Sequence, residues 1–389
     1  MQNSDHIDVY AGLLTFQNNE AYQTKKTPKY ATECFLFSDS PLTGEVSEQK
    51  PYAFLNLVPG THNFGHIQTA ALLRIFWYVR KHDPSIRMPD VSSSNSYHGG
   101  WANDEIASIA SLFLGIRLMA SDNVREFDLE SFKDFGRPEA NRKTPPQSFL
   151  NIRSPIVPNA YKTANLQDLS ELSNLSNISK TDYVSLVRSA RLYQNALWIV
   201  EADAATAWLL MVSALETAAQ CWKKEFSSIQ AFEKIELKLS EKLKGECSHA
   251  LYEEVAKTFG HKSKAQAKFL DFCEHFFPEP PEIRPPKQYQ IEWTRENFAK
   301  SLKTIYKYRS KALHNGVPFP QPLCAPAPYV AENNVAIEKG ILGIRCNTLG
   351  GTWLADDLPF SLNTFSYFTH GCLKKWLQHL MQDPANIQV

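Results

Sequence analysis

An arginine and a histidine five residues apart, Arg309 and His314, are the residues in this sequence with the clearest chemical use. The planar guanidinium group of arginine suits phosphate, and histidine moves protons near neutral pH. If the substrate is RNA, its 2′-hydroxyl can attack the adjacent phosphorus while the histidine transfers protons and the arginine stabilises charge on the non-bridging oxygens. This chemistry needs no metal ion, and DNA, which lacks the internal nucleophile, should not be cut by it.

The segment Thr294 to Leu313 must position this pair. Its spacing predicts a helix in which the arginine lies on the apolar face. The residues of that face are Phe298, Leu302, Ile305, Arg309 and Ala312. Asn315-Gly316 followed by Val317-Pro318 is typical of a helix C-terminus, so His314 is expected in the last turn. The carbonyl end of a helix carries partial negative charge, which suits a histidine that protonates a leaving oxygen.

Spacing alone favours a structural explanation of the pair, because R-x4-H arises often by chance. Arg309 would then pair with a core carboxylate such as Glu216, and His314 would satisfy carbonyl groups at the helix end. If the pair is catalytic, Glu216 would orient Arg309 instead.

Three neighbouring residues have two explanations each. Asn315 either shapes the helix end, which is favoured, or touches RNA. Tyr308 and Lys311 flank the motif on other helix faces, where they either contact bases and phosphates or are simply solvated.

No metal or cofactor site is expected. His62 and His66 have the H-x3-H spacing of a zinc pair, but no adjacent glutamate completes the metalloprotease motif and Gly65 disfavours a helix there. A turn is the preferred interpretation.

The chain divides into three predicted parts. Residues 1–135 are expected to form a small mixed α/β domain with a sensing or regulatory role, residues 136–180 a Pro/Ser/Asn-rich linker, and residues 181–389 a helical domain. Strands are predicted at 7–16, 30–37 and 52–58, and helices at 67–81 and 104–118. Leu166, Leu169, Leu172 and Leu175 recur every third residue, so the linker's tail has a short packed helix as its alternative.

Helical periodicity dominates the C-terminal part, and its fold class is therefore mainly α. The predicted helices are 183–200, 208–222, 229–243, 249–259, 264–276, 294–313 and 361–381, with a small β-hairpin inserted between 335 and 354.

Two segments of the helical part resemble the Apea-like branch of the HEPN superfamily. They are SARLYQNALWIVEADAATAWLLMVSALETAAQ (189–220) and IYKYRSKALHNGVPFP (305–320), and the resemblance spans roughly 183–381. It implies a HEPN-like helical bundle, Arg309 and His314 as ribonuclease residues, a homodimer whose two copies build one cleft, and a role as a toxin or antiviral-defence effector. The residue after the arginine is commonly Asn, Asp or His in active members, whereas this chain has Ser310.

Composition limits the alternatives. Lys plus Arg and Asp plus Glu both number 41, so any RNA contact must be local. The seven cysteines form no C-x2-C pair and no apolar stretch is long enough to span a bilayer, which predicts a cytoplasmic protein with reduced thiols.

Three hypotheses remain open. The first is a metal-independent, homodimeric endoribonuclease that leaves a 2′,3′-cyclic phosphate and responds to a protein or ligand trigger at its N-terminal domain. The second is a catalytically silent HEPN module for RNA or protein binding and dimerisation, which Ser310 favours. The third, main activity in the N-terminal domain, ranks last because residues 1–165 offer no convincing active site.

Overall fold

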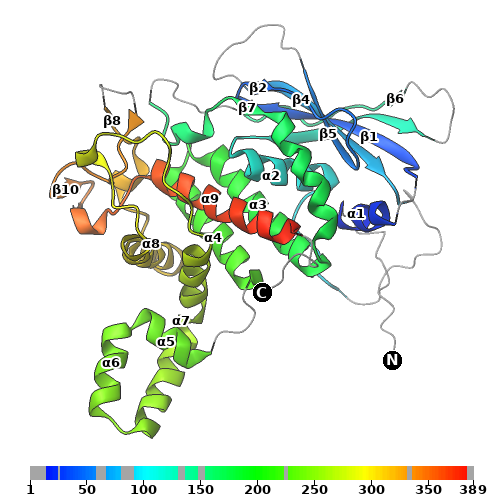
Figure 1. Cartoon of the computed structure of the whole chain (residues 1–389). Helices are drawn as coiled ribbons and strands as arrows, with labels where there is room; N and C mark the ends of the chain where they lie inside the picture. The colour runs from blue at the N-terminus through cyan, green and yellow to red at the C-terminus, as the bar shows by residue number, and fades with distance from the viewer. Residues whose placement is uncertain are drawn as a thin grey trace, which may run out of the picture. The chain divides into compact units, whose positions relative to one another are not determined.

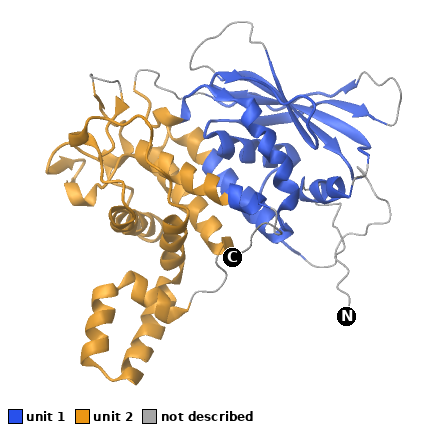
Figure 2. Ribbon diagram, viewed as in Figure 1, with its two compact units in different colours: residues 1–150, 160–194, 377–389 blue, residues 151–159, 195–376 orange. Residues whose placement is uncertain are grey.

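The computed structural model describes residues 15–24, 27–57, 67–79, 92–129, 136–147, 154–222, 227–330 and 335–382. The chain divides into two compact units (Figure 2). Unit 1 comprises residues 1–150, 160–194 and 377–389, and unit 2 comprises residues 151–159 and 195–376. The fold is mainly α, with a five-stranded antiparallel sheet and three two-stranded sheets among the described residues.

Unit 1 is built on a five-stranded sheet of order β3-β4-β1-β5-β6 (Figure 1). Its neighbouring strands are all antiparallel: β1 Tyr30–Ser38, β3 Tyr52–Asn56, β4 Gln68–Trp77, β5 Met119–Asp128 and β6 Arg137–Pro138. Helix α2 (Ala102–Leu114) packs against the sheet, and it ends at Gly115, whose φ of 68° is readily adopted only by glycine. The short strands β2 (Leu42–Thr43) and β7 (Ala164–Asn165) pair separately in parallel.

The structure confirms part of the predicted N-terminal pattern. The predicted strands at 30–37 and 52–58 correspond to β1 and β3, and the predicted helix at 104–118 corresponds to α2. Of the predicted strand at 7–16, residues 7–14 lie outside the described residues, and Thr15 and Phe16 begin helix α1 (Thr15–Gln23).

The helix predicted at 67–81 is wrong, because this segment forms strand β4. Ala71, Ile75 and Tyr78 have helical spacing, but Ala71, Leu73 and Ile75 are fully buried and alternate along the chain. Burial alternates because successive side chains of a strand point to opposite faces of the sheet, and β4 is a strand of that sheet, paired with β1 and β3.

The predicted linker, residues 136–180, contains a packed helix in the structure. Leu166, Leu169, Leu172 and Leu175 form the buried side of a 3-10 helix, η3 (Leu166–Asn177), whose three residues per turn match their spacing. The short packed helix, stated as the alternative, is confirmed. Residues 160–194 all belong to unit 1. The boundary between the compact units therefore does not coincide with the predicted domain boundary at residue 181.

Helices dominate the C-terminal part. They are α3 Lys180–Ile199, α4 Ala204–Trp222, α5 Ser228–Ile235, α6 Leu237–Glu246, α7 His249–His275, α8 Arg295–Asn315 and α9 Leu362–Met381. The inserted strands form two small hairpins, β8 (Tyr329–Val330) with β9 (Val335–Ala336) and β10 (Arg345–Thr348) with β11 (Gly351–Leu354). The predicted helices at 249–259 and 264–276 are one continuous helix, α7.

Aromatic side chains form the core of unit 2. The Trp208 ring on α4 stacks on Phe319 and Phe365, with centroid distances of 5.4 and 4.6 Å. The Trp208 indole N–H donates to the Leu323 carbonyl at 3.0 Å, which satisfies the only polar atom of this fully buried side chain. Helices α5, α6 and the first half of α7 project from the rest of unit 2 as an arm (Figure 2).

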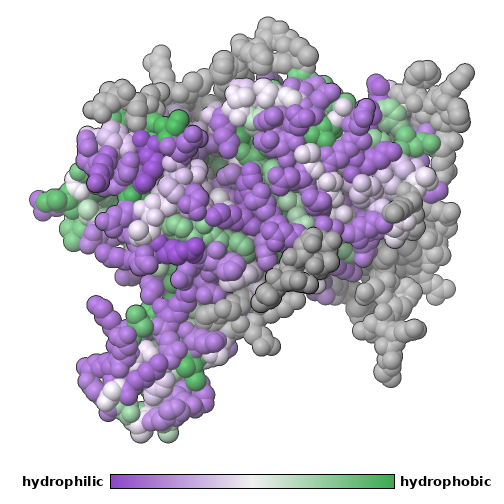
Figure 3. Space-filling model, in the orientation of Figure 1, coloured by the Kyte–Doolittle hydropathy of each residue, from purple (hydrophilic) through white to green (hydrophobic). Residues whose placement is uncertain are grey.

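Hydrophilic residues cover much of the face seen in Figure 3. No helix within the described ranges has both the length and the apolar character that crossing a bilayer requires.

Candidate functional site

Helix α8, labelled in Figure 1, carries both candidate catalytic residues near its C-terminal end. Phe298, Leu302 and Ile305 on its inner face are almost fully buried, as predicted. Thr294 caps its start by accepting the Asn297 N–H at 3.3 Å, and Gly316 ends it with a φ of 66°. The predicted helix and its C-terminal glycine cap are therefore confirmed.

Arg309 lies at the border of the buried face, with its side chain 21% exposed. Its Nη2 contacts Glu216 Oε2 on α4 at 2.6 Å, so the carboxylate suggested from the sequence is its partner. The Arg309 Nε is buried and has no hydrogen-bond partner among the described residues. The guanidinium is thus fixed by one carboxylate, and a hydrogen-bonding atom remains unused.

Tyr306 completes this arrangement and was not predicted. Its hydroxyl donates to Glu216 Oε1 at 2.8 Å, and the Arg309 guanidinium carbon lies 5.7 Å from its ring centre. Burial, and then the nearby charge of Glu216, raise the pKa of Tyr306, so the phenol keeps the proton that it donates. The sequence signal was its position three residues before Arg309, which places the two side chains as neighbours on the helix.

His314 occupies the last turn of α8 and is exposed, as is Asn315. Five residues of α-helix correspond to roughly 500° of rotation, so Arg309 and His314 of one chain point about 140° apart around the helix. A single chain therefore does not present the two groups on one face of α8.

The remaining predicted residues lie on other faces. Ser310 is half-buried and Lys311 is exposed. The Tyr308 hydroxyl donates to the Asp357 carbonyl at 3.0 Å, and burial, together with the charge of Asp357, raises its pKa to about 12. Tyr308 is thus held in a structural contact, while Lys311 is available to solvent.

No metal-binding cluster of three or more His, Cys, Asp and Glu side chains occurs in the described ranges. His62 and His66 lie outside those ranges.

Comparison with known protein families, with curated proteins and with solved structures finds no match to this chain. The candidate site therefore depends on the geometry of α8 and α4 and on the resemblance of the two sequence segments.

Proposed function

We propose that this chain is a metal-independent endoribonuclease of HEPN type in which Arg309 stabilises phosphate charge and His314 transfers protons. The observation that carries the proposal is the environment of Arg309. Its guanidinium is largely buried, held by Glu216, and lies one and a half turns before an exposed histidine at a helix end. The resemblance of 189–220 and 305–320 to the HEPN superfamily, with its helical bundle, supports the same function.

The proposal includes a homodimer. The rotation between Arg309 and His314 separates them within one helix, and two copies of α8 would supply two of each group to one cleft. A role in toxin action or antiviral defence follows from the resemblance alone, and the trigger is proposed to act at the N-terminal domain, residues 1–135.

The test is cleavage of labelled single-stranded RNA in EDTA by the purified full chain. Wild type should cut and leave a 2′,3′-cyclic phosphate, and Arg309→Ala and His314→Ala should each lose about a hundredfold or more in rate. His249→Ala and Arg295→Ala are matched controls, because both residues are exposed, His249 lies on α7, and Arg295 lies at the opposite end of α8 from the motif.

The second candidate, a silent HEPN module that binds RNA or protein, is favoured by Ser310 and by the Glu216 carboxylate that already compensates Arg309. RNA binding by wild type without cleavage of any tested RNA, unchanged in His314→Ala, would support this candidate over the enzyme.

A further inference from the structure

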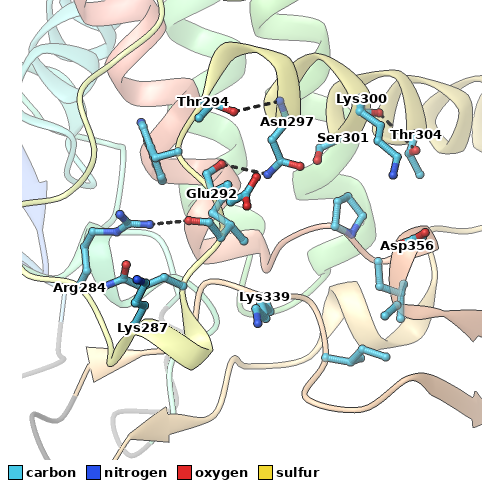
Figure 4. Close-up of a pocket in the computed structure, with 17 residues that line it drawn as sticks. Arg284, Lys287, Glu292, Thr294, Asn297, Lys300, Ser301, Thr304, Lys339 and Asp356 are labelled. Atoms are coloured by element: carbon cyan, nitrogen blue, oxygen red, sulfur yellow. Dashed lines mark hydrogen bonds between the residues drawn. The ribbon is translucent and has the colours of Figure 1, made fainter.

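Unit 2 contains a cavity of about 680 Å³ beside the first turns of α8 (Figure 4). Asn297, Ser301 and Thr304 of α8 form one wall, and Asp356 and Leu358 contribute another. Neither Arg309 nor His314 lines the cavity. Its volume falls in the range of roughly 300 to 1,000 Å³ that is typical of small-molecule sites.

Three lysines, Lys287, Lys300 and Lys339, line the cavity, and none forms an ion pair with a described carboxylate, although Lys339 Nζ donates one hydrogen bond to the Gln288 carbonyl at 2.6 Å. Two carboxylates, Glu292 and Asp356, also line it. The unpaired lysines therefore outnumber the acidic groups, and the N-terminus of α8 adds partial positive charge.

The fourth cation of the cavity, Arg284, is already neutralised. Its Nε donates to Glu338 Oε1 at 2.7 Å and its Nη2 to Oε2 at 2.6 Å, and Glu338 is 5% exposed. The same carboxylate accepts the Ile291 N–H at 2.8 Å. This pair fixes the cavity wall and leaves the three lysines as the groups that can attract an anion.

Ser301 supplies the cavity with a hydrogen-bonding group. The residue is 5% exposed, lines the cavity, and its hydroxyl forms no hydrogen bond with any described residue. Some helical hydroxyls in unit 2 bond to the carbonyl four residues earlier, as Thr217 does to Ser213. The Ser301 hydroxyl does not, and it borders the open space of the cavity, where it can donate to a ligand oxygen.

The cavity also offers apolar surface. Trp293, Ile341 and Leu358 line it, and the Trp293 ring is held in place because its N–H donates to the Pro278 carbonyl at 2.9 Å. A bound molecule would therefore meet both cationic and apolar side chains.

We propose that this cavity binds a small phosphate monoester whose body is a ring. Lys300 and Lys339 hold the phosphate, Ser301 donates its hydroxyl to a ligand oxygen, and the surface around Trp293 contacts the ring. The site is separate from Arg309 and His314, so the proposal stands whether or not the chain cleaves RNA.

Isothermal titration calorimetry of the full chain tests the proposal with AMP, ribose 5-phosphate, adenosine and inorganic phosphate. The two phosphate esters should bind saturably, and adenosine should bind at least about tenfold more weakly than AMP, because a charge-assisted hydrogen bond contributes that much. Tighter binding of AMP than of ribose 5-phosphate would identify a nucleotide site, and the reverse order a sugar-phosphate site. Equal binding of AMP and adenosine, or no saturable binding of either ester, would overturn the proposal.

Lys300→Gln and Lys339→Gln should each weaken binding of the preferred ester about tenfold. Lys307→Gln makes the same charge change on an exposed lysine of α8 that does not line the cavity, and it should leave binding within about twofold. Thermal unfolding checks that each variant is folded. If one of the two cavity variants is not, the other still tests the site. Equal losses of ester affinity in the cavity variants and in the control would contradict the site. The proposal would also fail if no small probe binds and a short single-stranded RNA binds instead, in a way that depends on Lys300 and Lys339.

Discussion

At the scale of single residues, Glu216 is the group on which the candidate site depends. One carboxylate oxygen faces Arg309 and the other accepts from Tyr306, so a single side chain from α4 fixes two side chains of α8. A partly buried guanidinium keeps a defined position only with such a partner.

Replacing Glu216 with alanine should therefore destabilise the fold more than replacing Tyr306 with phenylalanine. Glu216→Ala leaves the guanidinium charge uncompensated and should cost about 2 kcal/mol, below the full cost of breaking a buried pair because Arg309 is partly exposed. Tyr306→Phe removes one hydrogen bond at about 1 kcal/mol. Urea denaturation measures both.

The double variant Glu216→Ala with Arg309→Ala serves as the control for this prediction. It should recover part of the stability lost in Glu216→Ala, because no unpaired charge remains. If the losses in free energy of unfolding of the two single variants simply add in the double variant, the 2.6 Å contact between Arg309 and Glu216 contributes no coupling energy.

At the scale of elements, Asp203 caps the start of α4, the helix that carries Glu216. Its carboxylate accepts the Thr206 N–H at 3.0 Å and the Thr206 hydroxyl at 2.6 Å. These hydrogen bonds, the hydroxyl first, lower the pKa of Asp203 from its ordinary value. A lowered pKa in the folded state means that the stabilisation is present above the unfolded pKa and is lost as the pH falls through the folded pKa.

Asp203→Ala should thus cost about 1 kcal/mol at pH 7, and the difference from wild type should shrink as the pH falls below about 4. Asp203→Asn, which caps without titrating, is the matched control and should lose little at pH 7. Thermal unfolding between pH 7 and pH 3.5 provides the measurement; a difference between wild type and Asp203→Ala that stays constant over this range would argue against the ionised cap.

Gly260 sets how closely α5 approaches α7. A Cβ at this position would lie 1.7 Å from the Ser228 carbonyl oxygen, a backbone atom that cannot move aside cheaply. Gly260→Ala should therefore destabilise the arm, although the same change usually stabilises an isolated helix by about 1 kcal/mol.

Gly245→Ala is the control for this variant, because a Cβ there meets nothing within 4 Å. Hydrogen exchange should rise across α5 and α7 in Gly260→Ala and stay unchanged in Gly245→Ala. Equal protection in the two variants would show that the close approach does not limit packing.

Gly260 also explains one difference between the predicted and observed elements. A glycine between two apolar patterns suggests a break, but here it allows a close helix contact that local sequence does not reveal. Strand β4 was predicted as a helix for a related reason. Its burial comes from pairing with β1 and β3, and Ala71, Ile75 and Tyr78 also fit helical spacing.

Helix α8 could be predicted well because its signals are local. The cap at Thr294, the apolar phase through Ile305 and the stop at Gly316 all lie within one segment. The ion pair of Arg309 with Glu216 was anticipated from the need to compensate a buried charge. Tyr306 was missed although its position three residues before Arg309 was a local signal, whereas the cavity at Lys300 could not be predicted, because its lining comes from segments that are distant in the sequence.

At the scale of the whole molecule, equal numbers of acidic and basic residues give the chain no long-range attraction for RNA. Under the proposed function, RNA recognition must then come from local side chains. A dimer that brings two copies of α8 together would double the number of these side chains. The proposed function predicts that the active cleft combines Arg309 and His314 side chains from both copies of the dimer.

This arrangement can be tested by mixing two inactive variants. Arg309→Ala and His314→Ala chains, unfolded together and refolded, should form mixed dimers in which one intact arginine and one intact histidine remain in the shared cleft. RNA cleavage should return to a measurable fraction of wild-type activity, at most about half because only about half of the random dimers are mixed. Each variant refolded alone is the control. If the mixture cleaves no faster than the separate variants while light scattering shows dimers, the two groups do not combine across copies, and the composite cleft is wrong.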